Sequence, residues 1–203
     1  MADDCITMSA PTSDTIRQLA AKAQVLGLPQ QPNLSESTRR LLQQADQERR
    51  LLSNSEIQSL CQLSGVMAAP LEQLQGQAQH LVDQARHDLL EAQPHLVKPG
   101  GALYPEHRAE ACWRDCFHFL RVCCYAVSVA QPKFTNPQGM AALGELYAAL
   151  GVPVDGLLLA LARLQELACQ SYREAAPSSD AELLDAAFSE LRSQINSCVI
   201  TSC

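Results

Sequence analysis

Apolar residues recur every three or four positions along most of the chain, a spacing that is typical of amphipathic α-helices. No segment shows the strict alternation of apolar and polar residues that a half-buried strand requires. The pattern predicts eight helices, whose approximate ranges are 16–26, 35–52, 53–69, 71–93, 105–130, 136–150, 155–172 and 179–196. We therefore expect an all-α protein.

Local signals sharpen several of the expected helix ends. The capping-box motif Ser-x-x-Glu occurs at Ser53 and again at Ser179, where it would open the third and the last helix. Asn136 is followed by proline, which is the expected order for an N-cap and the first helical position. Pro70 and Pro94 are expected to bound the long helix between them.

Length and apolar content predict one principal domain with extensions. The chain has 203 residues, of which 47% are hydrophobic, and this is enough to bury a sizeable core. We expect an N-terminal extension over residues 1–34, with a short amphipathic helix and a linker, a helical domain over 35–196, and a flexible tail with cysteines over 197–203.

Composition argues against several classes of function. The net charge of −7 offers no basic surface for a phosphate backbone, so we expect no nucleic-acid partner. The longest helical run, 110–130, contains Arg114, Asp115, His118 and Arg121, so we expect no membrane span. The first residues carry acids where a secretory signal needs bases, so we expect a cytoplasmic protein.

The chain has nine cysteines. An odd number without a secretory signal is unlike a disulfide framework, so we expect most of them to be reduced and buried. Cys112 and Cys116, with His118 nearby, could start a metal site. The second ligand pair that structural zinc sites usually have is missing, so we expect no metal.

The most informative motif is the Cys-x-Arg-Asp sequence that begins at Cys112. On a helix, Cys112 and Asp115 lie on one side, one turn apart, and the long side chain of Arg114 can reach the same region. A linear tetrapyrrole would use all three groups, through a thioether, hydrogen bonds to a carboxylate and ion pairs to a guanidinium. By themselves, however, the four residues favour a simpler interpretation, a small buried cysteine beside a solvated ion pair.

Further segments change this balance. The chain resembles the phycobiliproteins, the bilin-carrying light-harvesting proteins of cyanobacteria and red algae, and most closely the allophycocyanin alpha-type chains. The resemblance runs from about residue 35 to about residue 196. It rests on four segments in family order, QQADQERRLLSNSEI (43–57), LVDQARHDLLEAQPHLVKPGGALY (81–104), CWRDCFHFLRVCCYA (112–126) and GELYAALGVPV (144–154).

The resemblance implies a globin-like helical fold with additional N-terminal helices, and a photophysical function without catalysis. It implies that phycocyanobilin or a related linear tetrapyrrole is attached covalently to Cys112. Asp115 would face the inner pyrrole nitrogens, and Arg114 and Arg108 would contact the propionates. The pigment, held rigid, would pass excitation energy to a neighbour within a phycobilisome-type assembly.

The resemblance also implies partners. The family forms heterodimers that assemble into rings, so an allophycocyanin-type partner chain or a second copy is expected, with phycobilisome linker proteins as further partners. Asp46 and Arg121 occupy the positions of the aspartate and arginine of the family's dimer interface. The assembly would associate with the cytoplasmic face of the thylakoid.

The pocket sequence departs from the family pattern. Where alpha-type relatives commonly have an aromatic residue, glycine, tryptophan and tyrosine after the aspartate, this chain has Cys116, Phe117, His118 and Phe119, and Trp113 replaces a smaller residue. A second hypothesis therefore remains, in which the chain is a nonharvesting relative that acts in assembly, regulation or bilin handling without a permanent pigment. An enzyme is disfavoured because Cys112 has no evident base arranged beside it.

Overall fold

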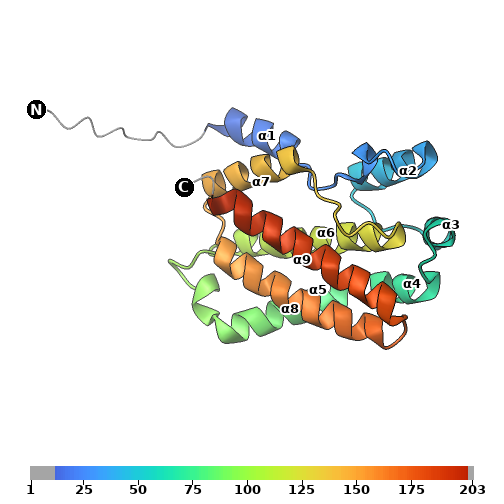
Figure 1. Cartoon of the computed structure of the whole chain (residues 1–203). Helices are drawn as coiled ribbons and strands as arrows, with labels where there is room; N and C mark the ends of the chain where they lie inside the picture. Colours follow the sequence, from blue (N-terminus) through green and yellow to red (C-terminus); the bar gives the residue numbers. More distant parts are fainter. Residues whose placement is uncertain (1–11, 201–203) are drawn as a thin grey trace, which may run out of the picture.

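The computed structural model describes residues 12–200, and this part of the chain forms nine α-helices and two short 3₁₀-helices (Figure 1). The elements are α1 (Ser13–Lys22), η1 (Leu28–Gln30), α2 (Glu36–Gln47), α3 (Asn54–Ser64), α4 (Ala68–Gly76), α5 (Ala78–Ala92), η2 (Pro94–Val97), α6 (Glu106–Ser128), α7 (Pro137–Leu150), α8 (Val154–Arg173) and α9 (Ser178–Ile200). One isolated antiparallel bridge joins Leu26 to Thr135. The expected all-α class is confirmed.

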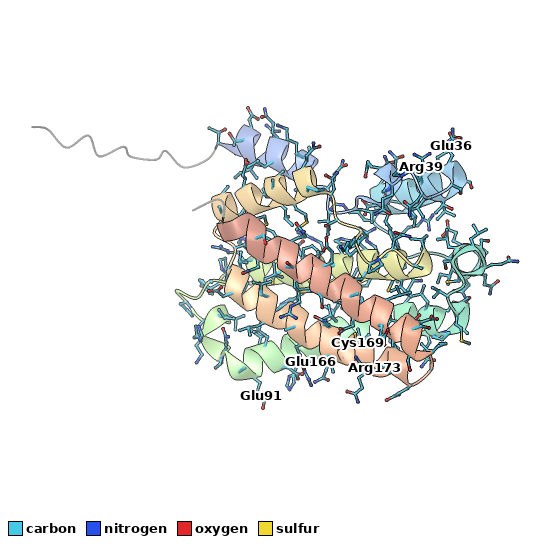
Figure 2. The ribbon with its side chains drawn as sticks, viewed as in Figure 1. Glu36, Arg39, Glu91, Glu166, Cys169 and Arg173 are labelled. Atoms are coloured by element: carbon cyan, nitrogen blue, oxygen red, sulfur yellow. The ribbon has the colours of Figure 1, made fainter. Side chains whose placement is uncertain are left out.

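Helix α6 is the central element of the core. Every residue from 119 to 128 is buried, because this half of the helix is contacted on several sides by α9, α5, α8, α4 and α3. A helix that is apolar around most of its circumference must be covered in this way. Figure 1 shows α9 lying across α6 with α8 alongside, and Figure 2 shows side chains filling the space between these helices.

The N-terminal helix is shorter than expected and is not itself part of the core. Helix α1 ends at Lys22 and buries none of its side chains. The anchoring residues follow the helix instead, since Leu26 and Leu28 are buried and the Gly27 N–H donates to the Phe134 carbonyl at 2.6 Å. Extended backbone, and not a longer amphipathic helix, fixes this segment.

The second expected helix, over 35–52, ends earlier, at Gln47. Arg49 adopts the left-handed conformation with φ of 51°, and the Arg50 N–H donates to the Ala45 carbonyl at 3.1 Å. This bond spans one residue more than a helical bond, so it closes the helix end and turns the chain. The residues up to 52 then approach α3 as irregular chain.

Two of the predicted caps are confirmed. The Ser53 hydroxyl accepts a hydrogen bond from the Glu56 N–H at 3.3 Å, and the Glu56 carboxylate accepts one from the Ser53 N–H at 2.8 Å, which completes the capping box of α3. The Asn136 side-chain oxygen accepts hydrogen bonds from the N–H groups of Gln138 and Gly139 at the start of α7. In both caps, the bonded residues are at most three positions apart, so the sequence alone can identify the cap.

The capping box predicted at Ser179 is wrong. Helix α9 begins at Ser178, so Ser179 already has helical backbone. Its hydroxyl donates to the carboxylate of Asp180, and that carboxylate accepts the Met67 N–H at 2.9 Å. A buried aspartate of α9 therefore caps the start of α4, 113 residues away.

The long helix expected over 71–93 is two helices. Helix α4 ends at Gly76 and α5 begins at Ala78, with a turn at Gln77 between them. Pro70 lies in the first turn of α4. Backbone N–H groups in the first turn have no acceptor within the helix, so the N–H that proline lacks costs no hydrogen bond there. This division raises the number of α-helices in the described residues from the expected eight to nine.

The C-terminal helix extends beyond the expected boundary at 196, because α9 continues to Ile200. Residues 197–200 therefore belong to α9, and 201–203 lie outside the described residues, as do 1–11 of the N-terminal extension. Within the described residues, no helix combines the length and the apolar composition needed to cross a membrane.

Candidate functional site

The first half of α6 carries the predicted attachment residues. Cys112 is buried, with 7% of its surface exposed, and Asp115 follows one turn later with its carboxylate partly buried. The Tyr147 hydroxyl of α7 donates a hydrogen bond to the Asp115 carboxylate at 3.1 Å. The structure therefore holds Asp115 in place on the same helix as Cys112.

Burial raises the pKa of Asp115 above its usual range, because a charged carboxylate is poorly solvated there. The hydrogen bond from Tyr147 and the charges of Arg114 and Arg49 lower the pKa of Asp115, and so partly offset the effect of burial. Tyr147 is itself buried, and burial followed by the nearby Asp115 charge raises its pKa well above the usual value. Tyr147 thus keeps its proton and remains a hydrogen-bond donor to Asp115.

A second thiol lies beside the predicted attachment point. Cys116, one turn after Cys112, is buried, and its hydrogen bond with Cys112, followed by burial, raises the pKa of Cys116 well above the usual value. Because a thiolate is the reactive form of cysteine, Cys116 is a poor nucleophile. Six of the described cysteines are buried free thiols, as expected: Cys61, Cys112, Cys116, Cys123, Cys124 and Cys169.

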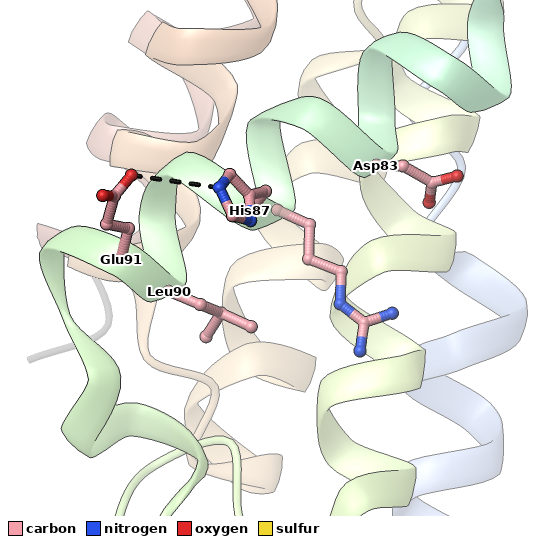
Figure 3. Close-up of a pocket in the computed structure, with 5 residues that line it drawn as sticks. Asp83, His87, Leu90 and Glu91 are labelled. Atoms are coloured by element: carbon pink, nitrogen blue, oxygen red, sulfur yellow. Dashed lines mark ion pairs between the residues drawn. The ribbon is translucent and has the colours of Figure 1, made fainter.

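Trp113 is packed against the helix next to α6. The guanidinium of Arg86, on α5, lies over the Trp113 ring at 5.7 Å from its centre, which is cation–π geometry. The Trp113 indole N–H is buried and has no hydrogen-bond partner. Arg86 also lines a surface groove of about 570 Å³, together with Asp83, His87, Leu90 and Glu91 (Figure 3). Cys112 does not line this groove.

The two arginines predicted to contact propionates have different environments. Arg114 is exposed and forms no ion pair with the described residues. Arg108 donates to the carbonyls of Leu150 and Gly151, at 3.0 and 2.7 Å, and so satisfies the C-terminal end of α7. Arg114 is available to a ligand, whereas Arg108 is engaged within the chain.

The two residues expected at a dimer interface contact each other within the chain. A guanidinium nitrogen of Arg121 lies 2.7 Å from the Asp46 carboxylate. Arg121 is buried and also donates to the Tyr125 hydroxyl at 2.9 Å, and that hydroxyl donates to the Arg50 carbonyl. The pair joins the end of α2 to α6.

The sequence indicated neither Tyr147 nor Arg86 as part of the site. Tyr147 lies in the GELYAALGVPV segment, and a buried tyrosine needs a partner for its hydroxyl. That requirement could have signalled a polar contact, but the identity of the acceptor depends on how α7 packs against α6. Among the described residues, no group of three or more His, Cys, Asp or Glu is arranged to hold a metal ion.

Comparison with known proteins matches residues 40–191 to the family model described as phycobilisome protein. The C-phycocyanin beta subunit of Arthrospira platensis is 30% identical over 132 residues, which cover 64% of this chain and 77% of that protein. The allophycocyanin alpha chain of Pyropia haitanensis is 29% identical over 128 residues, which cover 62% of this chain and 80% of that one. The allophycocyanin alpha chain of Galdieria sulphuraria is 30% identical with the same coverage.

Beta-type and alpha-type chains thus match at about the same identity. The matched segment contains all of α3 to α8 and most of α2 and α9, and the fold is all-α and globin-like, as in that family. The match spans well over half of the chain, and the resemblance inferred from the sequence is confirmed. The chain belongs to the phycobilisome protein family.

Proposed function

We propose that this chain is a light-harvesting subunit that carries a linear tetrapyrrole at Cys112 and passes excitation energy within a phycobilisome-type assembly. Membership of the family supports the general role. The observation that carries the site is the position of Asp115, one turn from Cys112 and held by the Tyr147 hydroxyl at 3.1 Å.

The residues around Cys112 suit such a pigment. The Arg114 guanidinium has no ion-pair partner in the described chain, and the buried Trp113 N–H has no acceptor. Each could donate to an oxygen of the pigment. Arg108 is the exception, because its guanidinium is already bonded at the end of α7. Cys112, Arg114 and Asp115 are therefore the residues that we assign to it.

The bound tetrapyrrole would supply the absorption of visible light. Cys112 would hold it covalently, and the Asp115 carboxylate would accept hydrogen bonds from its inner N–H groups. Tyr147 would fix the orientation of that carboxylate, so that fewer conformations are lost on binding. Arg114 would pair with a propionate. The protein's contribution is rigidity, which disfavours loss of the excitation energy as heat.

Attachment requires access to a thiol that is 93% shielded in the structure, since only 7% of Cys112 is exposed. Trp113 lies beside it, beneath the Arg86 guanidinium. Attachment would therefore require the side chains that shield Cys112 to move.

We further propose that the chain assembles with an allophycocyanin-type partner or a second copy, and with linker proteins, at the cytoplasmic face of the thylakoid. Asp46 and Arg121 would take part in that interface. The role is structural and photophysical, without an enzymatic reaction.

A nonharvesting relative is the second candidate, and one set of contacts favours it. The Asp115 carboxylate already has a partner within the chain, the Tyr147 hydroxyl, and the Arg86 guanidinium covers the face of the Trp113 ring. These two contacts would hold both side chains in place without a pigment. Such a protein would keep the fold for assembly, regulation or transient bilin handling.

Coexpression with haem oxygenase, a phycocyanobilin-forming reductase and a bilin lyase separates the two candidates. We expect a denaturing gel to show zinc-enhanced fluorescence in the wild-type band. The band should lose this signal in Cys112→Ala and keep it in the matched control Cys116→Ala. A wild-type band that stays unpigmented with the lyase present would favour the nonharvesting role.

A further inference from the structure

Helices α6 and α7 are joined at two places, one on each side of Cys112. Arg108 lies four residues before Cys112 and Asp115 lies three residues after it, so the three residues share one face of α6. Arg108 bonds to the end of α7, and Asp115 accepts the hydroxyl of Tyr147, which also belongs to α7. In Figure 1 the start of α6 and the end of α7 lie at the same end of the molecule.

The contact at Arg108 involves the C-terminal end of α7. One guanidinium nitrogen of Arg108 donates to the Leu150 carbonyl at 3.0 Å and to the Gly151 carbonyl at 2.7 Å. Carbonyl groups at the end of a helix have no partner within it and carry partial negative charge. A guanidinium suits them well, because charge-assisted hydrogen bonds are about twice as strong as neutral ones. Arg108 therefore holds the end of α7 against the start of α6.

The same helix end includes the backbone of Tyr147. Gly151 is left-handed, with φ of 60°, and the Val152 N–H donates to the Tyr147 carbonyl at 2.9 Å, which is the six-residue closure of a Schellman motif. The Tyr147 backbone and the two carbonyls that Arg108 binds thus belong to one closed turn. A displacement of this turn would move the Tyr147 hydroxyl relative to Asp115.

The start of α7 is held separately, by the segment that follows α1. The Asn136 N–H donates to the Val25 carbonyl at 2.8 Å, and Gly139 packs directly against the backbone of Gln24. The middle of α7 packs on α9. The contacts with the segment after α1 precede Tyr147 by two turns or more, so the contact with Arg108 is the one that acts on the last turn.

We propose that Arg108 is a positioning residue for the pigment site: by holding the last turn of α7 against α6, it keeps the Tyr147 hydroxyl within hydrogen-bond distance of the Asp115 carboxylate. Arg108 would act through Tyr147 and not by contact with a propionate. For the pigment, this role rests on the proposed function, in which Asp115 receives the inner N–H groups. The contact between Tyr147 and Asp115 is a property of the chain itself.

The role can be measured on the unpigmented full-length chain through the titration of Asp115. Carbon-13 NMR of the carboxyl groups, assigned with Asp115→Asn, gives the midpoint in the wild type, Arg108→Met, Tyr147→Phe and the double variant. Methionine keeps much of the length of arginine and removes its donors. We expect Arg108→Met to raise the midpoint by at least about half of the rise that Tyr147→Phe causes, because a hydrogen bond to the ionised carboxylate is weakened.

The double variant separates positioning from a direct effect of the arginine charge. In the Tyr147→Phe background, Arg108→Met should have no further effect, because the hydrogen bond is already absent. Arg108→Lys, which keeps a charged donor, should restore most of the wild-type midpoint. The proposal is overturned if Arg108→Met leaves the midpoint unchanged in a folded chain, or shifts it equally in both backgrounds.

Gly139→Ala is the control for a general loosening of α7. It disturbs the contact at the start of the helix, so it should leave the Asp115 midpoint close to the wild-type value. Circular dichroism and denaturant unfolding establish that each variant is folded. A shift as large as that of Arg108→Met would show that any damage to α7 moves the midpoint, and would contradict the specific role of Arg108.

A second measurement uses the pigment-loaded chain, and only this one depends on the proposed function. We expect Arg108→Met to retain the pigment, with its red absorption band altered in the same direction as in Tyr147→Phe. The spectrum of the double variant should match that of Tyr147→Phe alone, whereas a further change would assign Arg108 to direct contact with the pigment and overturn the positioning role. Failure of the wild-type chain to attach a pigment would count against the proposed function, and the NMR titration would still decide the role of Arg108.

Discussion

The Asp115 carboxylate is in an environment with two opposing effects on its charge. Burial raises its pKa, whereas the Tyr147 hydroxyl and the charge of Arg114 stabilise the ionised form. At the scale of single residues, this balance is what suits Asp115 to accept hydrogen bonds from a ligand with N–H groups. A partly buried carboxylate gains more from such donors than an exposed one.

Replacing Asp115 by asparagine should separate attachment from spectral tuning. The thiol of Cys112 is unchanged, so we expect the pigment to be attached, while the loss of the negative charge shifts or weakens the red absorption band. The absorption spectrum and the zinc-enhanced fluorescence of the same preparation report the two effects. An attached pigment with an unaltered spectrum would contradict the role of Asp115.

Replacing Tyr147 by phenylalanine should also alter the red absorption band of the pigment, through its effect on Asp115. The substitution removes the hydrogen bond of 3.1 Å, so the pKa of Asp115 should rise further, and the unfolding free energy should fall by about 1–2 kcal/mol. The exposed Tyr104 gives the control variant Tyr104→Phe. Equal spectra and equal denaturant midpoints for the two variants would show that Tyr147 does not position Asp115.

His118 should make stability depend on pH. Its pKa is about 4 in the folded chain and about 6.5 when unfolded, so the unfolded chain binds more protons between these values. Stability should therefore decrease as the pH falls from about 6.5 to 4, by about 1 kcal/mol after allowing for solvent screening of a half-exposed ring. Urea unfolding at several pH values measures this change in the free energy of unfolding. His118→Gln should flatten the profile in this window.

At the scale of elements, α3 shows how a helix start is fixed by several local contacts. Arg50 forms two hydrogen bonds with the Glu56 carboxylate, at 2.7 and 2.8 Å, in addition to the capping box. The hydrogen bonds from Arg50 are the main reason that the pKa of Glu56 falls to about 2. The turn after α2 and the start of α3 are thus joined as one unit.

Glu56→Gln should isolate the ion pair, because glutamine can still accept the Ser53 N–H. We expect a loss of about 1 kcal/mol in unfolding free energy at pH 7. The wild-type advantage should be fully present above about pH 4.5 and disappear as the pH falls towards 2, since the folded pKa is the lower one. Glu36→Gln, which removes the exposed pair with Arg40, is the control and should change stability little.

The contrast between Ser53 and Ser179 explains why some helix starts are readable from sequence. Both belong to the same motif, but only the first forms the box. Asp180, next to Ser179, instead caps α4 from a distance of 113 residues. A motif describes only the neighbours along the chain, whereas the outcome depended on the start of α9 lying close to the start of α4.

At the scale of the whole molecule, the N-terminal segment is held against α7 by close backbone contact. A Cβ atom at Gly139 would lie 1.8 Å from the Gln24 carbonyl oxygen, so only glycine fits. The bridge between Leu26 and Thr135 continues this contact. The backbone around Gln24 and Leu26, which precedes the family match, is therefore packed against the globin-like part of the chain.

Gly139→Ala should disrupt this contact. Alanine favours the helix by about 1 kcal/mol, but the clash should displace the segment around Gln24 and reduce stability by about 1–3 kcal/mol overall. Thermal unfolding measures the loss, and hydrogen exchange at residues 24–28 should accelerate. Gly76→Ala is the matched control, since nothing lies within 4 Å of its Cβ position. Equal behaviour of the two variants would contradict the close contact.

The sequence by itself determined the helical class, the local caps at Ser53 and Asn136, and the placement of Cys112 and Asp115 one turn apart. These features depend on residues a few positions apart, whose geometry the backbone of a helix sets. The family resemblance was readable for the same reason, because it rests on contiguous segments. It indicated which residues to examine but not how each is bonded in this chain.

Only the tertiary structure decided the partners of the polar side chains. Tyr147 bonds to Asp115 across 32 positions, Arg108 to the end of α7 across 42, and Arg121 to Asp46 across 75. Each of these groups had several chemically acceptable partners along the chain. The choice among them depends on which helices pack together, because a polar group that becomes buried must bond to whatever the fold brings within about 3 Å.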